Sequence, residues 1–305
     1  MTHESHDTRP DTHSNPDPER SAVSILGVGM LGAAVSRGLL RAGHEVTVWN
    51  RTEHKAKALA AEGASTAAMP GEAITASPLV IAAVSTYDDV HAVLDRHVGG
   101  LEGRTLVNLS SGTPDQSRAL AAWAGGHNIH YLDGAAMSGV RLVGEPEALF
   151  LYSGDADAFA AHETRLTALG RAIYLGSDAG AASLYDTALL TMNMGVLSGF
   201  YQAVALVDAA GVDAPTFAAV AVDYLPFVTG LLPGHARQIN QRRYPGDDGT
   251  LEVYAAAMGH IVDTGRRQGI DVELPAALTA LIERGVAAGH GDNGLARLAD
   301  VIARR

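Results

Sequence analysis

The first half of the chain alternates short apolar runs with stretches of helical spacing. Runs of strand length that are apolar throughout predict strands buried on both faces of a sheet. The expected strands occupy residues 22–27, 45–49, 79–84, 105–109, 129–134, 147–154 and 172–176. Between them, helical spacing ends on Gly43 in one segment and opens with Thr113 as N-cap and Pro114 in the first turn of another. This alternation is typical of parallel βαβ units.

The pattern changes after Gly180. A single helical pattern extends over residues 181–210, which corresponds to roughly 45 Å at 1.5 Å per residue. That length exceeds the diameter of a 100-residue domain, so we expect this helix to connect domains or subunits. The remaining residues, 211–305, are rich in Ala and Leu without strand-like alternation and predict a small helical domain.

One stretch of the long helix resembles a membrane span. Residues 187–207 carry no charge and are numerous enough to cross a bilayer. The stretch is flanked by Asp186 and Asp208 rather than by basic residues, it contains Asn193 and Gln202, and we find no second segment of this kind. These features favour a buried helix in a soluble protein.

The first twenty residues are polar, rich in Pro, Asp and His, and lack the apolar core of a secretory signal. We expect residues 1–20 to form a disordered tail. Its histidines, His3, His6 and His13, can in principle hold a metal, but we expect a solvated tail and no metal site.

Composition and charge exclude several function classes. Hydrophobic residues make up 47% of the chain and charged residues 18%, which excludes a largely disordered protein. The formal net charge of -12 has the opposite sign to that of most nucleic-acid or anionic-membrane binders. The chain has no cysteine, which excludes disulfides and thiolate chemistry and fits a reducing compartment. We therefore expect a cytoplasmic protein that binds neither nucleic acid nor membrane.

A G-x-G-x-x-G motif joins the first expected strand to its helix. Gly27 permits the tight turn, Gly29 lets the backbone approach a pyrophosphate, and Gly32 lets helix and strand pack closely. Glycines that serve only a turn are the alternative, but the alternating domain around the motif favours dinucleotide binding. The residues expected to contact the cofactor here are Gly27, Val28, Gly29, Met30, Leu31 and Gly32.

The expected fold is therefore α/β. An N-terminal Rossmann domain occupies residues 21–177, a long interdomain helix residues 178–210, and an all-α C-terminal domain for dimerisation and substrate binding residues 211–305.

Cations follow the second expected strand, where NAD-binding proteins place a carboxylate that accepts a hydrogen bond from the ribose 2′-hydroxyl. This chain has Asn50, Arg51 and Thr52, followed by Lys55 and Lys57, which are its only lysines. Positive charge suits a 2′-phosphate, so the sequence predicts NADPH as cofactor. A solvated helix start is the alternative. Further expected cofactor contacts are Val84, Ser85, Ser110 and Ser111.

A Rossmann domain, a long helix and a helical domain together resemble the β-hydroxyacid dehydrogenase superfamily. In that pattern the long helix opens with G-x-G-x-x-x-K-x-x-N-N, whose Lys serves the substrate oxygen. The corresponding segment here is GAASLYDTALL, residues 180–190, with Asp186 at the Lys position, and no lysine follows Lys57. The hydroxyacid chemistry has therefore lost its proton donor.

The substituted pattern is similar to that of the imine reductases, a resemblance carried by GHEVTVWNRT, NLSSGTPDQS, YLDGAAMSGV and SLYDTALLTMNMG. It implies NADPH-dependent reduction of a C=N bond, usually of cyclic imines, to an amine. It also implies a homodimer with exchanged helical domains. The long uncharged helix supports a dimer because it is too apolar to face water; the candidates for a lid from the second subunit are Tyr224, Phe227, Tyr254 and Met258.

Exchanging Lys for Asp inverts the charge of the site. Carbonyl reduction develops negative charge on oxygen, whereas imine reduction begins best from the cationic iminium. The Asp186 carboxylate would stabilise that cation or, with a pKa raised by apolar surroundings (Leu189, Leu190 and Met194), donate the proton. The alternative is a carboxylate that complements the helix dipole, although Asp186 lies about six residues into the helix.

Other residues are expected near the substrate. Tyr185 lies about 100° round the helix from Asp186, which favours a packed core aromatic over an acid. Met194 shares the Asp186 face and lines either an apolar pocket or the core. The resemblance places Ser111 between nicotinamide and substrate, where some relatives that join carbonyls to amines carry Asn, so Ser favours preformed imines. The expected substrate contacts are Ser111, Met137, Ser138, Tyr185, Leu190, Met194, Phe227 and Met258.

Two other functions remain open at this stage. The chain can be a β-hydroxyacid dehydrogenase-like NADP oxidoreductase with an unusual Asp, or a non-catalytic sensor that binds NADPH. Activity on hydroxyacids but not on cyclic imines would select the first, and tight NADPH binding without turnover would select the second.

Overall fold

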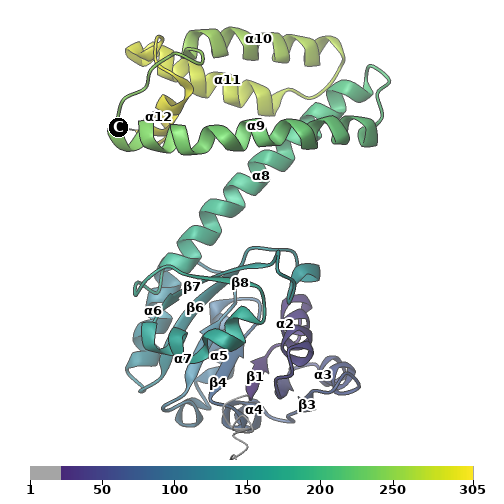
Figure 1. Cartoon of the computed structure of the whole chain (residues 1–305), viewed down its shortest axis with the longest axis vertical. Coiled ribbons are helices and arrows are strands. Elements are labelled where there is room, and N and C mark those ends of the chain that lie inside the picture. Colours follow the sequence, from purple (N-terminus) through teal and green to yellow (C-terminus); the bar gives the residue numbers. More distant parts are fainter. Residues whose placement is uncertain (1–21, 305) are drawn as a thin grey trace, which may run out of the picture. The chain divides into compact units, whose positions relative to one another are not determined.

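The computed structural model describes residues 22–304, and Figure 1 labels its helices and strands. The chain divides into two compact units, Met1–Thr191 and Met192–Arg305. The first unit is built on a sheet and the second on helices. The predicted tail at residues 1–20 lies outside the described residues.

An eight-stranded sheet forms the first unit, in the order β3-β2-β1-β4-β5-β6-β7-β8. The strands are β1 (Val23–Leu26), β2 (Val46–Trp49), β3 (Ser65–Thr66), β4 (Leu79–Ala82), β5 (Thr105–Asn108), β6 (His130–Ala136), β7 (Leu149–Gly154) and β8 (Arg171–Tyr174). Every strand expected from the sequence is present. The additional strand, β3, has two residues, too few to give a periodic signal.

The strand β7 departs from the expected parallel arrangement. It runs antiparallel to β6, with Leu132 opposite Gly154, while the other neighbouring pairs of the described sheet are parallel. Parallel neighbours need a crossover connection, usually a helix. Between β6 and β7 the chain forms only a short 3-10 turn, Val140–Leu142. The prediction of parallel units up to residue 177 is therefore wrong at this pair.

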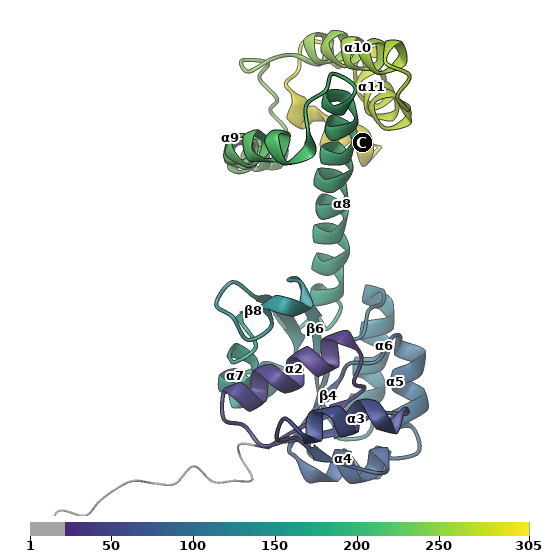
Figure 2. The ribbon, with the colours of Figure 1, turned by 90° about the vertical axis from the view of Figure 1, so that its right-hand side faces the viewer.

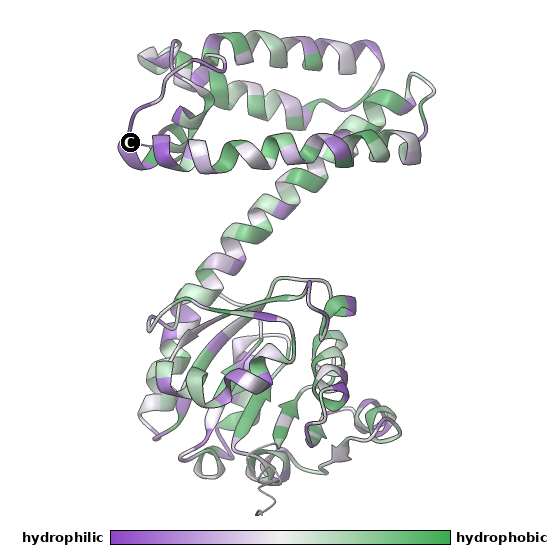
Figure 3. Ribbon diagram, in the orientation of Figure 1, coloured by the Kyte–Doolittle hydropathy of each residue, from purple (hydrophilic) through white to green (hydrophobic). Residues whose placement is uncertain are grey.

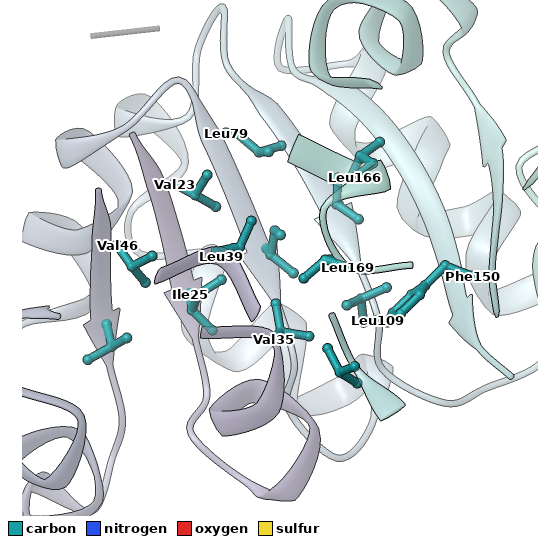
Figure 4. Close-up of a cluster of buried hydrophobic side chains, with 14 of the residues drawn as sticks. Val23, Ile25, Val35, Leu39, Val46, Leu79, Leu109, Phe150, Leu166 and Leu169 are labelled. Carbon is teal, nitrogen blue, oxygen red and sulfur yellow. The ribbon is translucent and has the colours of Figure 1, made fainter. Parts of the chain in front are cut away.

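Helices cover both faces of the sheet, and Figure 2 shows α5 and α6 on one side with α2 and α7 on the other. The helices are α2 (Met30–Arg41), α3 (Glu53–Ala60), α4 (Pro70–Ala76), α5 (Tyr87–Leu94), α6 (Pro114–Gly125) and α7 (Ala156–Thr167). Val23 and Ile25 of β1 pack with residues of α2, α3 and α7 (Figure 4). Leu26 packs on the opposite face with residues of α4, α5 and α6. Burial on both faces explains why the strands are apolar throughout.

The start of α6 follows the sequence prediction closely. Thr113 is the N-cap, and its hydroxyl accepts a hydrogen bond from the Gln116 backbone N–H. The Gln116 side chain accepts in return from the Thr113 backbone N–H at 2.9 Å, which completes a capping box. Pro114 occupies the first helical turn, where its missing N–H costs nothing.

The predicted long helix is α8 (Ala181–Asp208). Its first turn is tied to the sheet, because the buried hydroxyl of Ser153 on β7 accepts a hydrogen bond from the Ala182 N–H and donates one to the Ala179 carbonyl. The second unit is helical as expected, with α9 (Ala214–Gln241), α10 (Leu251–Arg267), α11 (Glu273–Gly285) and α12 (Leu298–Ile302).

Two long helices, α8 and α9, expose large apolar side chains such as Met194 and Phe227, and Figure 3 colours much of both ribbons as hydrophobic. Both helices are long and apolar enough to cross a membrane by length and composition, and neither apolar stretch is buried within the chain. The expectation of a single such segment, buried within the chain, is therefore wrong. It failed because α9 contains Asp223 and two prolines, which interrupt an uncharged run in the sequence without ending the helix.

We expect Thr113→Ala to lower the free energy of unfolding of the first unit by about 1 kcal/mol, because an N-cap hydrogen bond is lost. Both tryptophans, Trp49 and Trp123, lie in this unit, so urea unfolding followed by tryptophan fluorescence reports on it. Thr52→Ala is the matched control, since Thr52 is the N-cap of α3 but makes no side-chain cap hydrogen bond. Equal effects of the two substitutions would contradict the capping assignment.

Candidate active site

The loop between β1 and α2 needs glycine at two positions for steric reasons. Gly27 has a φ of +98°, and a Cβ there would lie 2.7 Å from the Ala83 carbonyl oxygen. A Cβ on Gly32 would overlap the Gly27 carbonyl oxygen. Gly29 differs, because no heavy atom of the described chain lies within 4 Å of the position its Cβ would take. The backbone at Gly29 is therefore open to close approach by a ligand.

The N-terminus of α2 is free to bind an anion. Its N-cap, Gly29, provides no side-chain hydrogen bond, and the first turn contains no acidic residue. The first N–H groups of the helix therefore have no capping side chain as hydrogen-bond acceptor, and the helix dipole adds positive potential at this end. This combination suits the pyrophosphate of a dinucleotide.

A cleft of about 710 Å³ opens over this loop, a size typical of a cofactor site. The predicted cofactor contacts that line it are Gly27, Gly29, Met30, Leu31, Asn50, Arg51, Thr52, Lys55, Val84, Ser85 and Ser111. The other predicted contacts, Val28, Gly32 and Ser110, do not line it. The side chains of Val28 and Ser110 are buried, and Gly32 faces the Gly27 carbonyl.

Two cationic side chains in the cleft have no partner within the described residues. Arg51 and Lys55 are exposed, and neither side chain forms a hydrogen bond or ion pair with the part of the chain that the structure describes. Lys57, one helical turn from Glu53 on the same helix, instead pairs with that carboxylate at 2.8 Å. The free cations fit a ligand that carries an additional phosphate.

Asn50 lines the cleft as predicted and also holds its walls together. Its side-chain oxygen accepts a hydrogen bond from the Val28 N–H at 2.8 Å, and its amide nitrogen donates to the Thr52 carbonyl at 2.9 Å. Asn50 therefore links the glycine loop to the segment that carries Arg51, and it holds both parts of the cleft in place. The residues present fit a dinucleotide with a 2′-phosphate.

Other residues of the cleft were not predicted: Trp49, Met69, Pro70, Ala83, Asp89, Ala92, Val93, Arg96, His97 and Leu109. Trp49, Ala83 and Leu109 lie at or just after the carboxyl ends of β2, β4 and β5, where ligands of open α/β sheets bind, and that rule would have found them. Arg96 and His97 follow α5, and no local signal marks them.

A second, smaller cavity of about 70 Å³ contains Asp186. Its lining residues are Leu31, Leu109, Ser110, Ser111, Gly112, Gly134, Ala135, Ala136, Ser183 and Asp186. Leu31, Leu109 and Ser111 line the large cleft as well, so the two spaces adjoin. The structure thus brings the expected Asp186 and Ser111 together at the end of the cofactor cleft.

The carboxyl group of Asp186 is partly buried and forms no hydrogen bond or ion pair within residues 22–304. Burial raises the pKa of Asp186, in the direction expected from the sequence. A carboxyl group with a raised pKa can hold a proton closer to neutral pH and can also stabilise a cation next to it.

The cavity around Asp186 is lined largely by apolar residues, among them Leu31 and Leu109, but not by the three expected from the sequence. Leu190 and Met194 are about half exposed, and Leu189 packs against the cluster that includes Leu151; none of them lines the cavity. Helical side chains point back toward the N-terminus, so Asp186 shares its surroundings with Ser183 one turn earlier.

The remaining predicted substrate contacts are dispersed. Tyr185 is 50% exposed, so it is not packed in the core of the chain as expected. Met137 packs against the cluster of Ala135, Leu151 and Ala182. The Ser138 hydroxyl accepts a hydrogen bond from the Leu149 N–H at 2.8 Å. Two further predicted contacts lie in the second unit: the largely exposed Phe227 on α9 and the partly buried Met258 on α10.

Both halves of the chain match known protein families. Residues 22–176 match the NAD binding domain of 6-phosphogluconate dehydrogenase, and residues 178–304 match the NADPH-dependent reductive aminase-like C-terminal domain. An NADPH-dependent reductive aminase from Aspergillus oryzae is 36% identical over 281 residues, which covers 90% of this chain and 95% of that protein.

Solved structures agree with these matches. The reductive aminase from Aspergillus terreus in complex with NADPH and ethyl levulinate matches with a TM-score of 0.88 at 38% identity, over 92% of this chain and 99% of that one. An imine reductase from Streptomyces aurantiacus matches with a TM-score of 0.87 at 33% identity, over 93% of this chain and 99% of that one. The chain therefore belongs to the family of NADPH-dependent reductive aminases and imine reductases.

Proposed function

We propose that this protein reduces the C=N bond of imines to amines with a hydride from NADPH. The observation that carries the proposal is the position of Asp186, in a cavity that adjoins the cofactor cleft through Leu31, Leu109 and Ser111. When bound, NADPH supplies the hydride. The protein's own residues bind and orient the reactants and control the charge on the substrate nitrogen.

The charge of the site favours C=N over C=O reduction. The two lysines of the chain lie on α3, and one of them is paired with Glu53, so no ammonium group serves a developing alkoxide. Asp186 instead presents a carboxyl group whose pKa is raised by burial. It can donate a proton to an imine nitrogen or, when ionised, stabilise the iminium. Ser111 next to it favours imines formed before they bind.

Cofactor selectivity is assigned to Arg51 and Lys55. Both line the cleft, and both lack a protein partner in the described chain. A guanidinium group can form two parallel hydrogen bonds with a phosphate, and a lysine adds a point charge. Asn50 holds this segment against the glycine loop through Val28, so the two cations stay close to the ribose end of the cleft.

A second copy of the chain is proposed to cover the apolar helices. Monomeric proteins rarely leave large contiguous apolar patches in water. Large hydrophobic side chains that are exposed on α8 and α9 include Leu184, Tyr185, Leu190, Met192, Met194, Val196, Tyr201, Val220, Val222, Tyr224, Phe227 and Leu232. In a homodimer with exchanged helical domains, Phe227 and Met258 of the partner subunit would complete the substrate pocket.

This arrangement also supports a cytoplasmic rather than a membrane protein. The two long helices carry Asp186 and Asp208 on α8 and Asp223 on α9, and α8 lacks the flanking basic residues that anchor a membrane span, although Arg242 and Arg243 follow α9. Covering by a second copy removes the apolar surface from water without a bilayer.

We expect Arg51→Ala and Lys55→Ala each to raise the KM for NADPH about tenfold or more, because a charge-assisted contact with the 2′-phosphate is lost. The KM for NADH should change less than twofold, since NADH lacks that phosphate. Lys57→Ala is the matched control, because Lys57 is paired with Glu53. Equal use of NADPH and NADH by the unmodified protein would contradict the assignment.

We expect Asp186→Ala to lower kcat on an unprotonated cyclic imine roughly 10²–10⁴-fold, the usual contribution of a general acid. Asp186→Asn should be nearly as damaging, since it keeps the shape but loses the charge and the proton. The corresponding N-methyl iminium ion needs no proton and should lose less. Steady-state kinetics on the imine and the N-methyl iminium test this, with unchanged NADPH affinity as control. A loss of less than threefold on the imine would show that Asp186 is structural.

We expect the protein to be a homodimer at micromolar concentration, because an exposed apolar surface of this extent favours association. Analytical ultracentrifugation of the full chain gives its mass in solution, and the same sample is assayed for NADPH oxidation with a cyclic imine. A fully active monomer would refute both the dimer and the shared pocket.

A further inference from the structure

A buried carboxylate lies beneath the Asp186 cavity. Asp133 of β6 is 1% exposed and is surrounded by hydrogen-bond donors. Its Oδ1 accepts from the Tyr87 hydroxyl at 2.6 Å and the Tyr131 hydroxyl at 3.0 Å, and its Oδ2 accepts from the Ser183 hydroxyl at 2.5 Å. Burial raises the pKa of Asp133, and these hydrogen bonds counteract the rise. Hydroxyl donors reach both of its oxygens, so the carboxyl group accepts hydrogen bonds on each of them.

This carboxylate fixes the direction of the Ser183 hydroxyl. A serine hydroxyl has one proton and two lone pairs, and the proton of Ser183 is committed to Asp133. Ser183 also lines the small cavity, one helical turn before Asp186. Its oxygen can therefore face the cavity only as a hydrogen-bond acceptor.

A second serine in the same cavity lacks a partner. Ser110 is 4% exposed, and its hydroxyl oxygen forms no hydrogen bond within the described chain. Its backbone N–H is bonded to the Asn108 side-chain oxygen at 3.1 Å, and the Asn108 amide nitrogen approaches Asp133 at 3.4 Å. The Asp133 network thus positions both serines. A buried hydroxyl without a partner is costly unless a ligand satisfies it.

We infer that Ser183 and Ser110 form the subsite that recognises the N–H of the substrate, with Asp133 as the positioning residue. Given the proposed C=N reduction, on which this inference rests, Ser183 accepts a hydrogen bond from the N–H of the protonated imine, and Ser110 gains its missing partner there. The neighbouring walls are Gly134, Ala135 and Ala136, and the space of about 70 Å³ is large enough for a small polar group. Substrates that carry an N–H are therefore favoured over N-alkylated ones.

The test compares Ser183→Ala, Ser110→Ala and Tyr131→Phe with the unmodified protein, at saturating NADPH, on a cyclic imine and its N-methyl iminium analogue. We expect each serine variant to raise the KM for the imine about tenfold, the effect of a lost hydrogen bond to a charged group. The KM for the N-methyl iminium should change less than twofold. Tyr131→Phe removes a donor from Asp133 without lining the cavity, so it should lower the Tm and leave the ratio of the two KM values within twofold.

Ser110→Ala keeps the test decisive if Ser183→Ala does not fold. The Ser110 hydroxyl has no described protein partner, so its removal should not lower the Tm, and a purely structural role predicts no kinetic effect. Equal KM increases on both substrates in the serine variants would overturn the subsite, and so would a change of the KM ratio in Tyr131→Phe as large as theirs. Absence of turnover by the unmodified protein would instead contradict the proposed function and the subsite with it.

Discussion

The first turn of α8 is fixed on the sheet by two buried side chains, Ser153 of β7 and Asp133 of β6, and the position of Asp186 depends on these hydrogen bonds. The strands beneath them are buried on both faces and cannot shift without disturbing two cores. Asp186 follows Ser183 by one helical turn, so the same anchors place its carboxyl group beside the loop after β5 that carries Ser111. A loosely attached helix would leave this carboxyl group in solvent.

The two ends of the site carry opposite charge. At the ribose end of the cleft, the side chains of Arg51 and Lys55 have no partner among residues 22–304 and suit an anion. At the other end, Asp186 and the buried Asp133 create negative potential suited to a cationic iminium. A protein with a net charge of -12 thus presents two exposed cations at the place where a phosphate is expected. The cations thus lie where the anionic cofactor is expected, and the carboxyl groups lie where the cationic substrate is expected.

The sequence predicts those parts of the molecule that depend on local pattern. The strands, the glycine loop and the α6 cap are determined by residues near one another in the chain. The position of Asp186 within the segment 180–190 is likewise a local feature of the sequence. The antiparallel β7 was missed because nothing in the apolar run 147–154 records the absence of a crossover helix. The residues that surround Asp186 were not all predicted. Ser110 and Gly134 lie far from Asp186 in the sequence, and only the folding of the sheet brings them to its cavity. Likewise, Arg96 and His97 join the cleft through tertiary packing alone.

The central claim, that the carboxyl group on α8 serves reduction of C=N bonds with NADPH, is tested most directly by NADPH oxidation by the unmodified protein. Cyclic imines, ketone–amine pairs and, with NADP+ in the reverse direction, β-hydroxyacids would be assayed side by side. The account predicts turnover of cyclic imines and none of β-hydroxyacids. Oxidation of β-hydroxyacids without imine turnover, or tight NADPH binding with no turnover of any imine, would contradict it.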